Sequence, residues 1–292
     1  MTALRVIGEE REVRLGPDVI RYREVGSGPT LVFVHGILAR GVLWRDVVAG
    51  LSGRFRCVVP DLPLGGHAVP ISSETDLSPR GVARLVADFV AALDLHDVTL
   101  VGSDTGGAIC QIVIADRPEG IGRLVLTNCD AYEAFFPWQF NLSFHYGPRL
   151  FGPRYVDLLA RMLRARPAQR LLLKAVAKRR MDDATLAAYF ANLIGNAGVR
   201  RDLTRFLRPV SRRYTLETSG RFPAFRRPVL IAWGEDDIFF LSRYARRLQE
   251  YFPDARLRFV AGSRPFVPED RPEALAGYVA EFVRRGSEGG LA

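Results

Sequence analysis

The 292-residue sequence predicts an α/β fold in which a mostly parallel sheet carries helices on both faces. Short apolar segments alternate with segments of helical periodicity, which is typical of βαβ units. This alternation is interrupted once, by about 100 residues of helical and aromatic-rich sequence, and then resumes. The hydrophobic content is 48 %, enough for a full core, so we expect one large domain with an insertion.

The expected elements follow in order. Two alternating segments, 12–15 and 19–25, flank Gly16-Pro17-Asp18 and predict a hairpin. Ser78-Pro79 marks the start of a helix. The other expected strands are 30–34, 56–59, 98–101, 123–127, 228–233 and 256–260, and the expected helices are 42–51, 79–93, 106–116, 242–252 and 272–285. The strands together predict an eight-stranded sheet.

The interruption sets the expected domain division. Residues 1–129 and 228–285 are assigned to the core domain, residues 130–227 to a helical lid after the sixth strand, and residues 286–292 to a flexible tail. Ligands of such sheets bind beyond the carboxyl ends of the strands, so we expect the lid to cover the site.

Composition narrows the function classes. The first residues lack the apolar segment of a signal peptide, and no stretch approaches the length of a membrane span, so we expect a cytoplasmic protein with no membrane partner. The cations are 39 Arg and only 2 Lys, which indicates a bacterium with a high-GC genome. The three cysteines, Cys57, Cys110 and Cys129, have apolar neighbours and no metal-ligand spacing, which indicates buried free thiols.

The net charge of +9 is unevenly placed. Residues 149–213 carry 16 basic and 4 acidic side chains, a net +12, so the remainder of the chain sums to −3. The segment lacks the interleaved aromatic residues that stack nucleic-acid bases, and we expect no nucleic-acid partner. A solvated basic helical face is the first interpretation, and attraction for acidic substrates or an acidic partner is the alternative.

The most informative motif is Gly102-Ser103-Asp104-Thr105-Gly106, which lies between an apolar strand and an apolar helix. This pattern is typical of a nucleophile elbow, a sharp turn that holds one side chain exposed above a sheet. Asp104 stands at its tip. An aspartate there indicates attack on carbon to form an ester, whereas a serine would indicate ordinary acyl transfer.

With its other motifs, the chain resembles the α/β-hydrolase fold superfamily, in the branch that holds epoxide hydrolases and haloalkane dehalogenases. The resemblance covers nearly the whole chain and rests on motifs in the right order. They are His35-Gly36, Asp61-Leu62-Pro63, the elbow at Gly102 to Gly106, Trp233-Gly234-Glu235-Asp236-Asp237, and a closing segment at Arg264 to Pro272.

The resemblance implies roles for several residues. The Asp104 carboxylate would attack carbon, and the backbone N–H groups of Ile37 and Thr105 would form the oxyanion hole. The acid of the triad would be Asp237, after the penultimate strand, or Asp130, after the strand before the lid. Asp237 is favoured, with a capping or turn role as the alternative for each.

The sequence departs from the family at two places. Pro265 stands where the catalytic histidine is expected, so the water that should cleave the ester has no obvious base. Thr105 stands where dehalogenases and many epoxide hydrolases have a tryptophan that holds the halide, and Ile37 has no side-chain donor either. Dehalogenation is therefore disfavoured. The candidates for a replacement base are His67, on the loop after the fourth strand, and His145, in the lid.

The lid is rich in aromatic residues that could hold a bulky, apolar substrate or pack on the core. They are Phe135, Phe136, Trp138, Phe140, Phe144, Tyr146, Tyr155, Tyr189 and Tyr214. In epoxide hydrolases, lid tyrosines donate a hydrogen bond to the epoxide oxygen. We take Phe136, Trp138, Tyr146 and Tyr214 as substrate-binding candidates, together with His35, which belongs to the His-Gly turn of this family.

Three function hypotheses remain open. The first is an enzyme in which Asp104 opens an epoxide or a related bond. The second is a non-hydrolytic enzyme, with Asp104 as general acid or base for cyclisation, elimination or isomerisation. The third is a non-catalytic ligand-binding protein of the same fold. We expect a small apolar substrate, no metal, no organic cofactor and, as a possible assembly, a homodimer.

Overall fold

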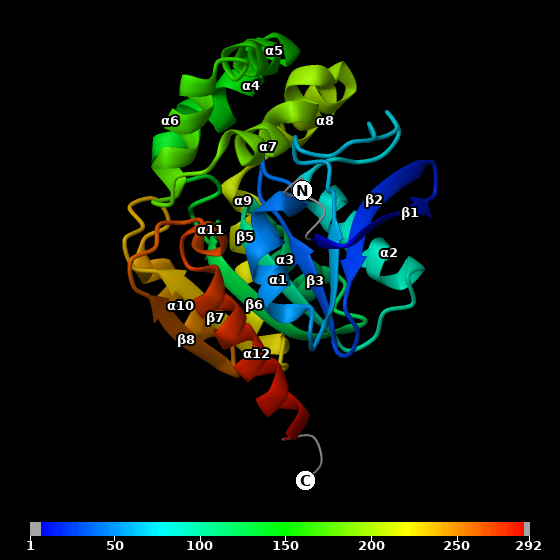
Figure 1. Ribbon diagram of the computed structural model, residues 1–292, viewed down its shortest axis with the longest axis vertical. Helices are drawn as coiled ribbons and strands as arrows, with labels where there is room; N and C mark the ends of the chain where they lie inside the picture. The colour runs from blue at the N-terminus through cyan, green and yellow to red at the C-terminus, as the bar shows by residue number, and fades with distance from the viewer. Residues whose placement is uncertain (1–6, 289–292) are drawn as a thin grey trace.

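The computed structural model describes residues 7–288 and confirms the α/β-hydrolase fold class (Figure 1). Eight strands form one sheet in the order β1-β2-β4-β3-β5-β6-β7-β8. The hairpin strands β1 and β2 run antiparallel, β2 is antiparallel to β4, and every other neighbouring pair is parallel. The strands are β1 (Glu9–Leu15), β2 (Asp18–Val25), β3 (Thr30–Val34), β4 (Arg56–Pro60), β5 (Val98–Asp104), β6 (Ile121–Cys129), β7 (Val229–Gly234) and β8 (Ala255–Val260).

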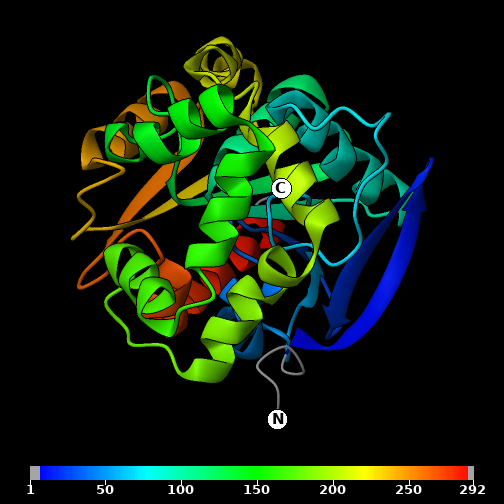
Figure 2. The same cartoon turned by 90° about the horizontal axis from the view of Figure 1, so that it is seen from above.

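Helices cover both faces of the sheet. On one side α1 packs against α12, and on the other α2 packs against α3, as the view along the sheet in Figure 2 shows. The central strands β3, β5 and β6 are buried on both faces, and each contains an apolar run, at residues 31–34, 100–101 and 124–126. These helices and their neighbours are α1 (Arg45–Leu51), α2 (Pro79–Ala92), α3 (Thr105–Asp116), α10 (Ser242–Tyr251), α11 (Val267–Asp270) and α12 (Pro272–Glu288).

Several boundaries differ from the predicted ones. β5 continues beyond 101 to Asp104, so the elbow residue is the last of its strand. The segment predicted as a helix from residue 42 begins with a 3₁₀ turn, η2 (Gly41–Trp44), before α1. Helix α12 extends through Glu288, so the predicted flexible tail was wrong for residues 286–288, and its remainder lies outside the described residues.

The helical insertion lies between β6 and β7. Its elements are η3 (Trp138–Phe140), η4 (Asn141–Tyr146, a π-helix), α4 (Gly147–Phe151), α5 (Pro153–Met162), α6 (Arg166–Val176), α7 (Asp183–Gly195), α8 (Ala197–Leu207), α9 (Arg212–Ser219) and η5 (Phe222–Ala224). Helix α9 packs on α3 of the core, whereas α4 to α8 stand above the strand ends in Figure 1. We call residues 138–207 the cap.

One buried carboxylate joins the cap to the core. Asp202 of α8 has no exposed surface and accepts hydrogen bonds from the Ile71 backbone N–H at 2.7 Å and from His67 Nε2 at 3.3 Å. Its other oxygen accepts from Arg201 at 2.9 Å and from Arg205 at 3.3 Å. Burial alone would raise the pKa of Asp202, but the hydrogen bonds outweigh it and lower the pKa.

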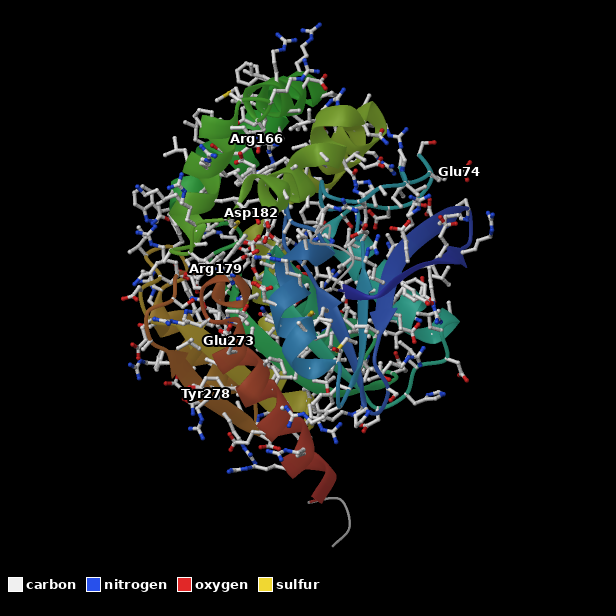
Figure 3. The ribbon with its side chains drawn as sticks, viewed as in Figure 1. Glu74, Arg166, Arg179, Asp182, Glu273 and Tyr278 are labelled. Carbon is white, nitrogen blue, oxygen red and sulfur yellow. The ribbon has the colours of Figure 1, made fainter. Side chains whose placement is uncertain are left out.

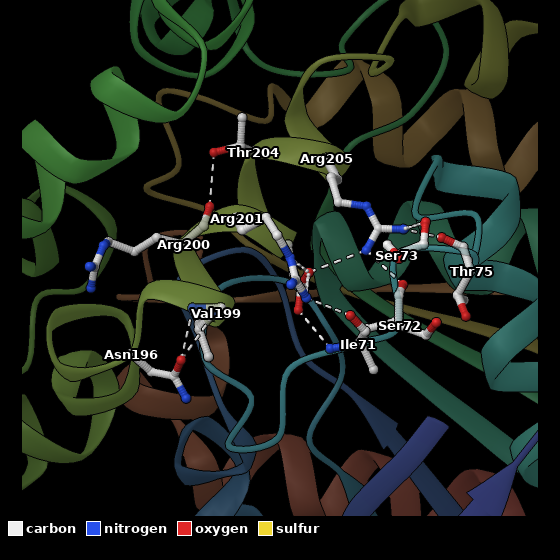
Figure 4. Close-up of polar contacts among 12 residues, drawn as sticks. Ile71, Ser72, Ser73, Thr75, Asn196, Val199, Arg200, Arg201, Thr204 and Arg205 are labelled. Carbon is white, nitrogen blue, oxygen red and sulfur yellow. Dashed lines mark hydrogen bonds and ion pairs between the residues drawn. The ribbon is translucent and has the colours of Figure 1, made fainter. Parts of the chain in front are cut away.

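The two arginines extend this contact along the loop after β4. Arg201 Nη2 donates to the Ile71 carbonyl at 2.6 Å, and Arg205 Nη1 donates to the Ser72 carbonyl at 2.8 Å (Figure 4). Arg205 also donates to the Thr75 carbonyl. The Asp202 cluster therefore fixes the cap to a loop that begins at the carboxyl end of a central strand.

Replacing Asp202 with asparagine should lower the free energy of unfolding by about 3 kcal/mol, because it leaves buried donors without their charged partner. Urea denaturation at pH 7 measures this. The control is Asp157→Asn, which removes the more exposed Asp157–Arg200 pair of the same cap and should change stability by about 0.5 kcal/mol. Equal losses in the two variants would contradict the role given to Asp202.

Candidate active site

Asp104 occupies a strained turn between β5 and α3. Its backbone has φ 56° and ψ −135°, a left-handed conformation that non-glycine residues rarely adopt. The turn also needs glycine at 106, because a Cβ there would collide with the carbonyl oxygens of Val34 and His35. The sequence pattern and the backbone therefore agree on an elbow that presents Asp104.

The Asp104 carboxyl group lies against two backbone donors. The N–H groups of Thr105 and Ile37 lie close enough to it to lower its pKa. Gly36 makes the approach possible, because a Cβ at that position would overlap the carboxylate. The structure thus brings together Asp104, Ile37 and Thr105, the three residues that the sequence predicted for the nucleophile and the oxyanion hole. Their catalytic roles remain predictions.

Asp104 lies in the wall of an apolar cavity of about 60 Å³ between core and cap. Among residues 7–288, the polar side chains that line it are those of Asp104 and Tyr189 alone. The other lining residues are Ile37, Leu38, Ala39, Phe136, Pro137, Phe140, Phe144, Leu172, Leu173, Val176, Phe190, Phe240 and Phe266. In this closed form the cavity has room for a few water molecules or a small group, and a bulky ligand needs the cap to move.

The apolar surroundings change the acidity of Asp104. Burial raises the pKa of the Asp104 carboxyl to about 7, the two backbone N–H groups oppose the rise, and the nearby charge of Asp237 adds to it. Near neutral pH, the group is therefore divided between its acid and its carboxylate.

Asp237 follows β7 and is held by three donors. Asn128 Nδ2 donates to its Oδ2 at 2.6 Å, and the backbone N–H groups of Phe239 and Phe240 donate to its Oδ1 at 2.7 and 3.1 Å. Asn128 also accepts from the Gly234 N–H at 2.6 Å, which joins β6 to the end of β7. Burial raises the pKa of Asp237 to about 7 in spite of these hydrogen bonds.

Asp130 follows β6 and is fully buried. Thr105 Oγ1 donates to its Oδ2 at 3.0 Å, and its Oδ1 has no hydrogen-bond partner. Burial, and then the charge of Asp104, raise the pKa of Asp130 well above the usual range. Asp130 is therefore harder to ionise than an ordinary aspartate, and its carboxyl group holds Thr105 of the elbow.

No histidine of the described chain lines this cavity. Pro265, at the position of the expected histidine, is a buried turn residue, and its neighbour Phe266 supplies an apolar wall. His35 was predicted to bind substrate, but it is fully buried outside the cavity. Its Nδ1–H donates to the Gly36 carbonyl at 2.9 Å, and its Nε2 accepts from the Leu62 N–H at 3.0 Å. Burial lowers the pKa of His35 to about 4, so it is a neutral brace of its turn.

The two histidines predicted as replacement bases lie elsewhere. His67 is buried in the Asp202 cluster described above. His145 lies on η4, where its ring packs edge-on against Tyr146 with the ring centroids 5.0 Å apart. Neither lines the cavity that holds Asp104. His67 instead contacts Asp202 of the cap, and His145 lies on η4.

Of the four aromatic substrate-binding candidates, the structure brings only Phe136 to the cavity. Trp138 is 77 % exposed and Tyr146 is 52 % exposed, on the outer side of the cap. Tyr214 lines a separate surface groove, where the Arg80 guanidinium lies 6.0 Å from its ring centroid. Placing Trp138, Tyr146 and Tyr214 at the Asp104 cavity was therefore wrong.

A polar group behind the cavity wall was not recognised as a unit in the sequence. Tyr189 of α7 donates from its hydroxyl to Glu269 Oε1 at 2.6 Å, and Arg45 of α1 makes a paired contact with Glu269 at 2.5 and 2.7 Å. All three residues are buried. Tyr189 appeared among nine lid aromatics, and Glu269 in the closing segment. The available signal was the apolar run 265–268 directly before Glu269, which favours burial of the glutamate and therefore a cationic partner.

Comparison with known proteins agrees with this geometry. The haloalkane dehalogenase 2 of Mycobacterium tuberculosis is 28 % identical over 270 residues, covering 90 % of each chain. A cis-3-alkyl-4-alkyloxetan-2-one decarboxylase of Xanthomonas campestris is 28 % identical over 284 residues, covering 89 % of each chain. Among solved structures, the epoxide hydrolase CorEH superposes with a TM-score of 0.80 at 18 % identity, covering 95 % of this chain and 99 % of that one.

The alpha/beta hydrolase fold family itself matches residues 29–272, which include every motif from the His-Gly turn to the end of the closing segment. The match thus spans both the strands that carry Asp104 and Asp237 and the helical insertion between them. The chain belongs to the α/β-hydrolase fold family.

Proposed function

We propose that this protein is a hydrolase-family enzyme in which Asp104 opens a strained oxygen-containing ring of an apolar molecule, as in epoxide hydrolysis. The observation that carries the proposal is the Asp104 carboxyl group, which lies beside two backbone N–H groups on a strained elbow in the wall of an apolar cavity. One oxygen can be stabilised by these donors while the other attacks a ring carbon. The attack forms an ester and breaks the ring C–O bond.

Tyr189 is the proposed proton donor to the departing ring oxygen. It is the only hydroxyl-bearing side chain that lines the cavity, and Glu269 and Arg45 hold it from behind. As the C–O bond breaks, the Tyr189 O–H would turn its hydrogen bond from Glu269 to the developing alkoxide. This gives a role to one lid tyrosine that the sequence alone did not single out.

Hydrolysis of the ester needs a base, and we assign this role to Asp237. It lies close enough to Asp104 for their charges to interact, and its pKa of about 7 suits a general base at neutral pH. A water molecule deprotonated by Asp237 would attack the ester carbonyl. The Ile37 and Thr105 N–H groups would stabilise the oxyanion formed in that step. Collapse of the oxyanion would break the ester C–O bond, release the diol and regenerate the Asp104 carboxylate, and the proton taken up by Asp237 would restore the Tyr189 hydroxyl.

Two observations favour a second candidate, which is non-hydrolytic ring opening. No histidine lines the cavity, and one relative is named as a decarboxylase of a four-membered lactone. Loss of CO₂ from such a ring leaves an alkene and consumes no water, so it needs no base to activate water. In this case Asp104 would act as an acid or base on the substrate. Dehalogenation has less support, because neither Thr105 nor Ile37 offers a side-chain donor for a halide.

Isotope labelling distinguishes hydrolysis through an Asp104 ester from direct attack of water on the epoxide. In one turnover in oxygen-18 water with small alkyl and aryl epoxides, the ester route places the unlabelled Asp104 oxygen in the diol and oxygen-18 in the Asp104 peptide. Mass spectrometry of both products measures this, and Asp104→Asn should lose turnover. A diol labelled on its first turnover, with no label in the peptide, would contradict covalent attack.

Asp237→Asn should trap the ester, seen as an added epoxide mass on the intact protein, because the base that hydrolyses it is gone. The matched control is the neighbouring Asp236→Asn, which removes an exposed carboxylate paired with Lys178. It should leave release of the ester unchanged. If Asp237→Asn turns over normally, Asp237 is not the base.

The pH dependence of kcat/KM distinguishes the ester route from acid catalysis. Burial raises the pKa of Asp104 to about 7, so a nucleophilic carboxylate should make kcat/KM rise as pH increases through 7. Because Asp104 and Asp237 interact, the rise reports the pair and not one residue. A fall in activity over the same range would instead favour a protonated Asp104 and the non-hydrolytic candidate.

Tyr189→Phe should lower kcat by about 100-fold, because it removes the proton donor while keeping the ring that lines the cavity. Tyr214→Phe is the matched control, since this second tyrosine of the inserted segment lines a different groove. Steady-state kinetics with an epoxide measures both. An equal effect of the two substitutions would contradict the role given to Tyr189.

A further inference from the structure

The cap contains one helical segment that is apolar on two opposite faces. Residues 138–151 run continuously through η3, η4 and α4. Phe140 and Phe144 face inward and line the cavity. Trp138, Leu142 and Leu150, spaced in multiples of four residues, face outward and are 77 %, 76 % and 72 % exposed. An exposed apolar face of this kind calls for a partner.

The exposed apolar surface continues beyond this segment onto neighbouring helices. Helix α4 packs against both η4 and α5. We call the following exposed residues the apolar stripe: Trp138, Leu142, Leu150 and Phe151, with Leu158 and Met162 of α5. Leu158 and Met162 are four residues apart, so they lie on the same face of α5.

Cationic side chains accompany the apolar stripe. Arg154 and Arg161 belong to α5, Arg164 follows it, and Lys174 lies on α6; all four are exposed. None of these four forms an ion pair within residues 7–288. Figure 3 shows Arg166, at the start of α6, in the same upper part of the cap. Unpaired positive charge therefore lies on α5 together with the apolar stripe, and continues along the chain to α6.

We propose that this cap surface binds the surface of an anionic lipid bilayer. Apolar and aromatic side chains that enter the interface, together with Arg and Lys that meet anionic headgroups, are the two features that such binding needs. A second copy of this chain fits less well. A symmetric dimer through the apolar stripe would bring two cationic surfaces together.

Such a contact differs from membrane insertion. No helix in the described part of the chain is long and apolar enough to cross a bilayer. No membrane partner was expected from the sequence, because no stretch is long enough to span a bilayer. A helix that lies in the bilayer interface does not need that length. The proposal therefore amends that expectation for the cap surface alone.

The position of the apolar stripe also bears on substrate access, a point that rests on the proposed function. Its central segment forms a wall of the Asp104 cavity through Phe140 and Phe144. On α6, Leu171 is 73 % exposed, while its neighbour Leu172 lines the cavity. A bilayer against the cap would be separated from the Asp104 cavity by one helix. A lipophilic substrate could then pass from the bilayer to the cavity.

Vesicle flotation with the full chain tests the proposal. We expect the protein to float with vesicles of equal parts phosphatidylcholine and phosphatidylglycerol, and to bind less at high salt. Vesicles of phosphatidylcholine alone should bind it more weakly. The double variant Leu142→Ser/Leu150→Ser should weaken partitioning about tenfold or more. Leu216→Ser, on the partly exposed face of α9, is the control and should bind as the wild type does.

A charge-matched pair of variants tests the electrostatic part. Arg161→Gln/Arg164→Gln should reduce binding to the anionic vesicles. Arg256→Gln/Arg258→Gln removes the same charge from exposed positions of β8, far along the chain from the cap, and should reduce it less. Equal reductions would mean that net charge alone, and not this surface, governs the association.

Three results would overturn the proposal: no flotation of the wild type, flotation unchanged by the leucine substitutions, or a dimer in sedimentation that those substitutions dissociate. The last result would assign the apolar stripe to self-association. Asp104→Asn should bind vesicles as the wild type does, because Asp104 lies inside the cavity. Failure of vesicle binding and failure of the catalytic proposal are thus measured separately.

Discussion

The strained backbone of Asp104 is the constraint on which the site depends. A left-handed residue between a strand and a helix is unfavourable by about 1–3 kcal/mol, and it persists only when its surroundings leave no alternative. Here those surroundings include Gly36 and Gly106, neither of which leaves room for a Cβ. The close approach at Gly106 brings α3 against the end of β3, and this places the Ile37 N–H beside the carboxyl group. One conformational demand thus fixes the proposed nucleophile and its proposed oxyanion donors together.

The second feature of the site is the raised pKa of its carboxyl groups. Asp130 and Asp237 are buried near the partly buried Asp104, and within residues 7–288 no cationic side chain lines the cavity. In a triad with histidine, an imidazolium can balance one negative charge, and Pro265 supplies none. Burial instead raises the pKa of all three carboxyl groups, which favours their uncharged forms.

More of the fold than of the candidate site could be predicted from the sequence. Strand and helix alternation, the elbow and the turn after β7 were readable because they depend on local spacing, and the parallel core of the sheet follows from them. The environment of His67 was not readable, because its partner Asp202 lies 135 residues further along the chain. The orientation of Tyr189 and Trp138 was not readable either. The cap helices carry apolar residues on both faces, so periodicity does not say which face points to the cavity.

The hydrogen bond between Tyr189 and Glu269 joins the cap to the core, so the position of Tyr189 depends on the position of the cap. A cavity of about 60 Å³ admits a larger ligand only if the cap lifts, and lifting carries Tyr189 on α7 away from Glu269 on α11. Glu269 is also paired with Arg45 of the core, so the Glu269–Arg45 contact does not depend on Tyr189. Under the role proposed for Tyr189, the cap and the core must meet again before ring opening is complete, so the chemistry would follow closure of the cap over a bound substrate.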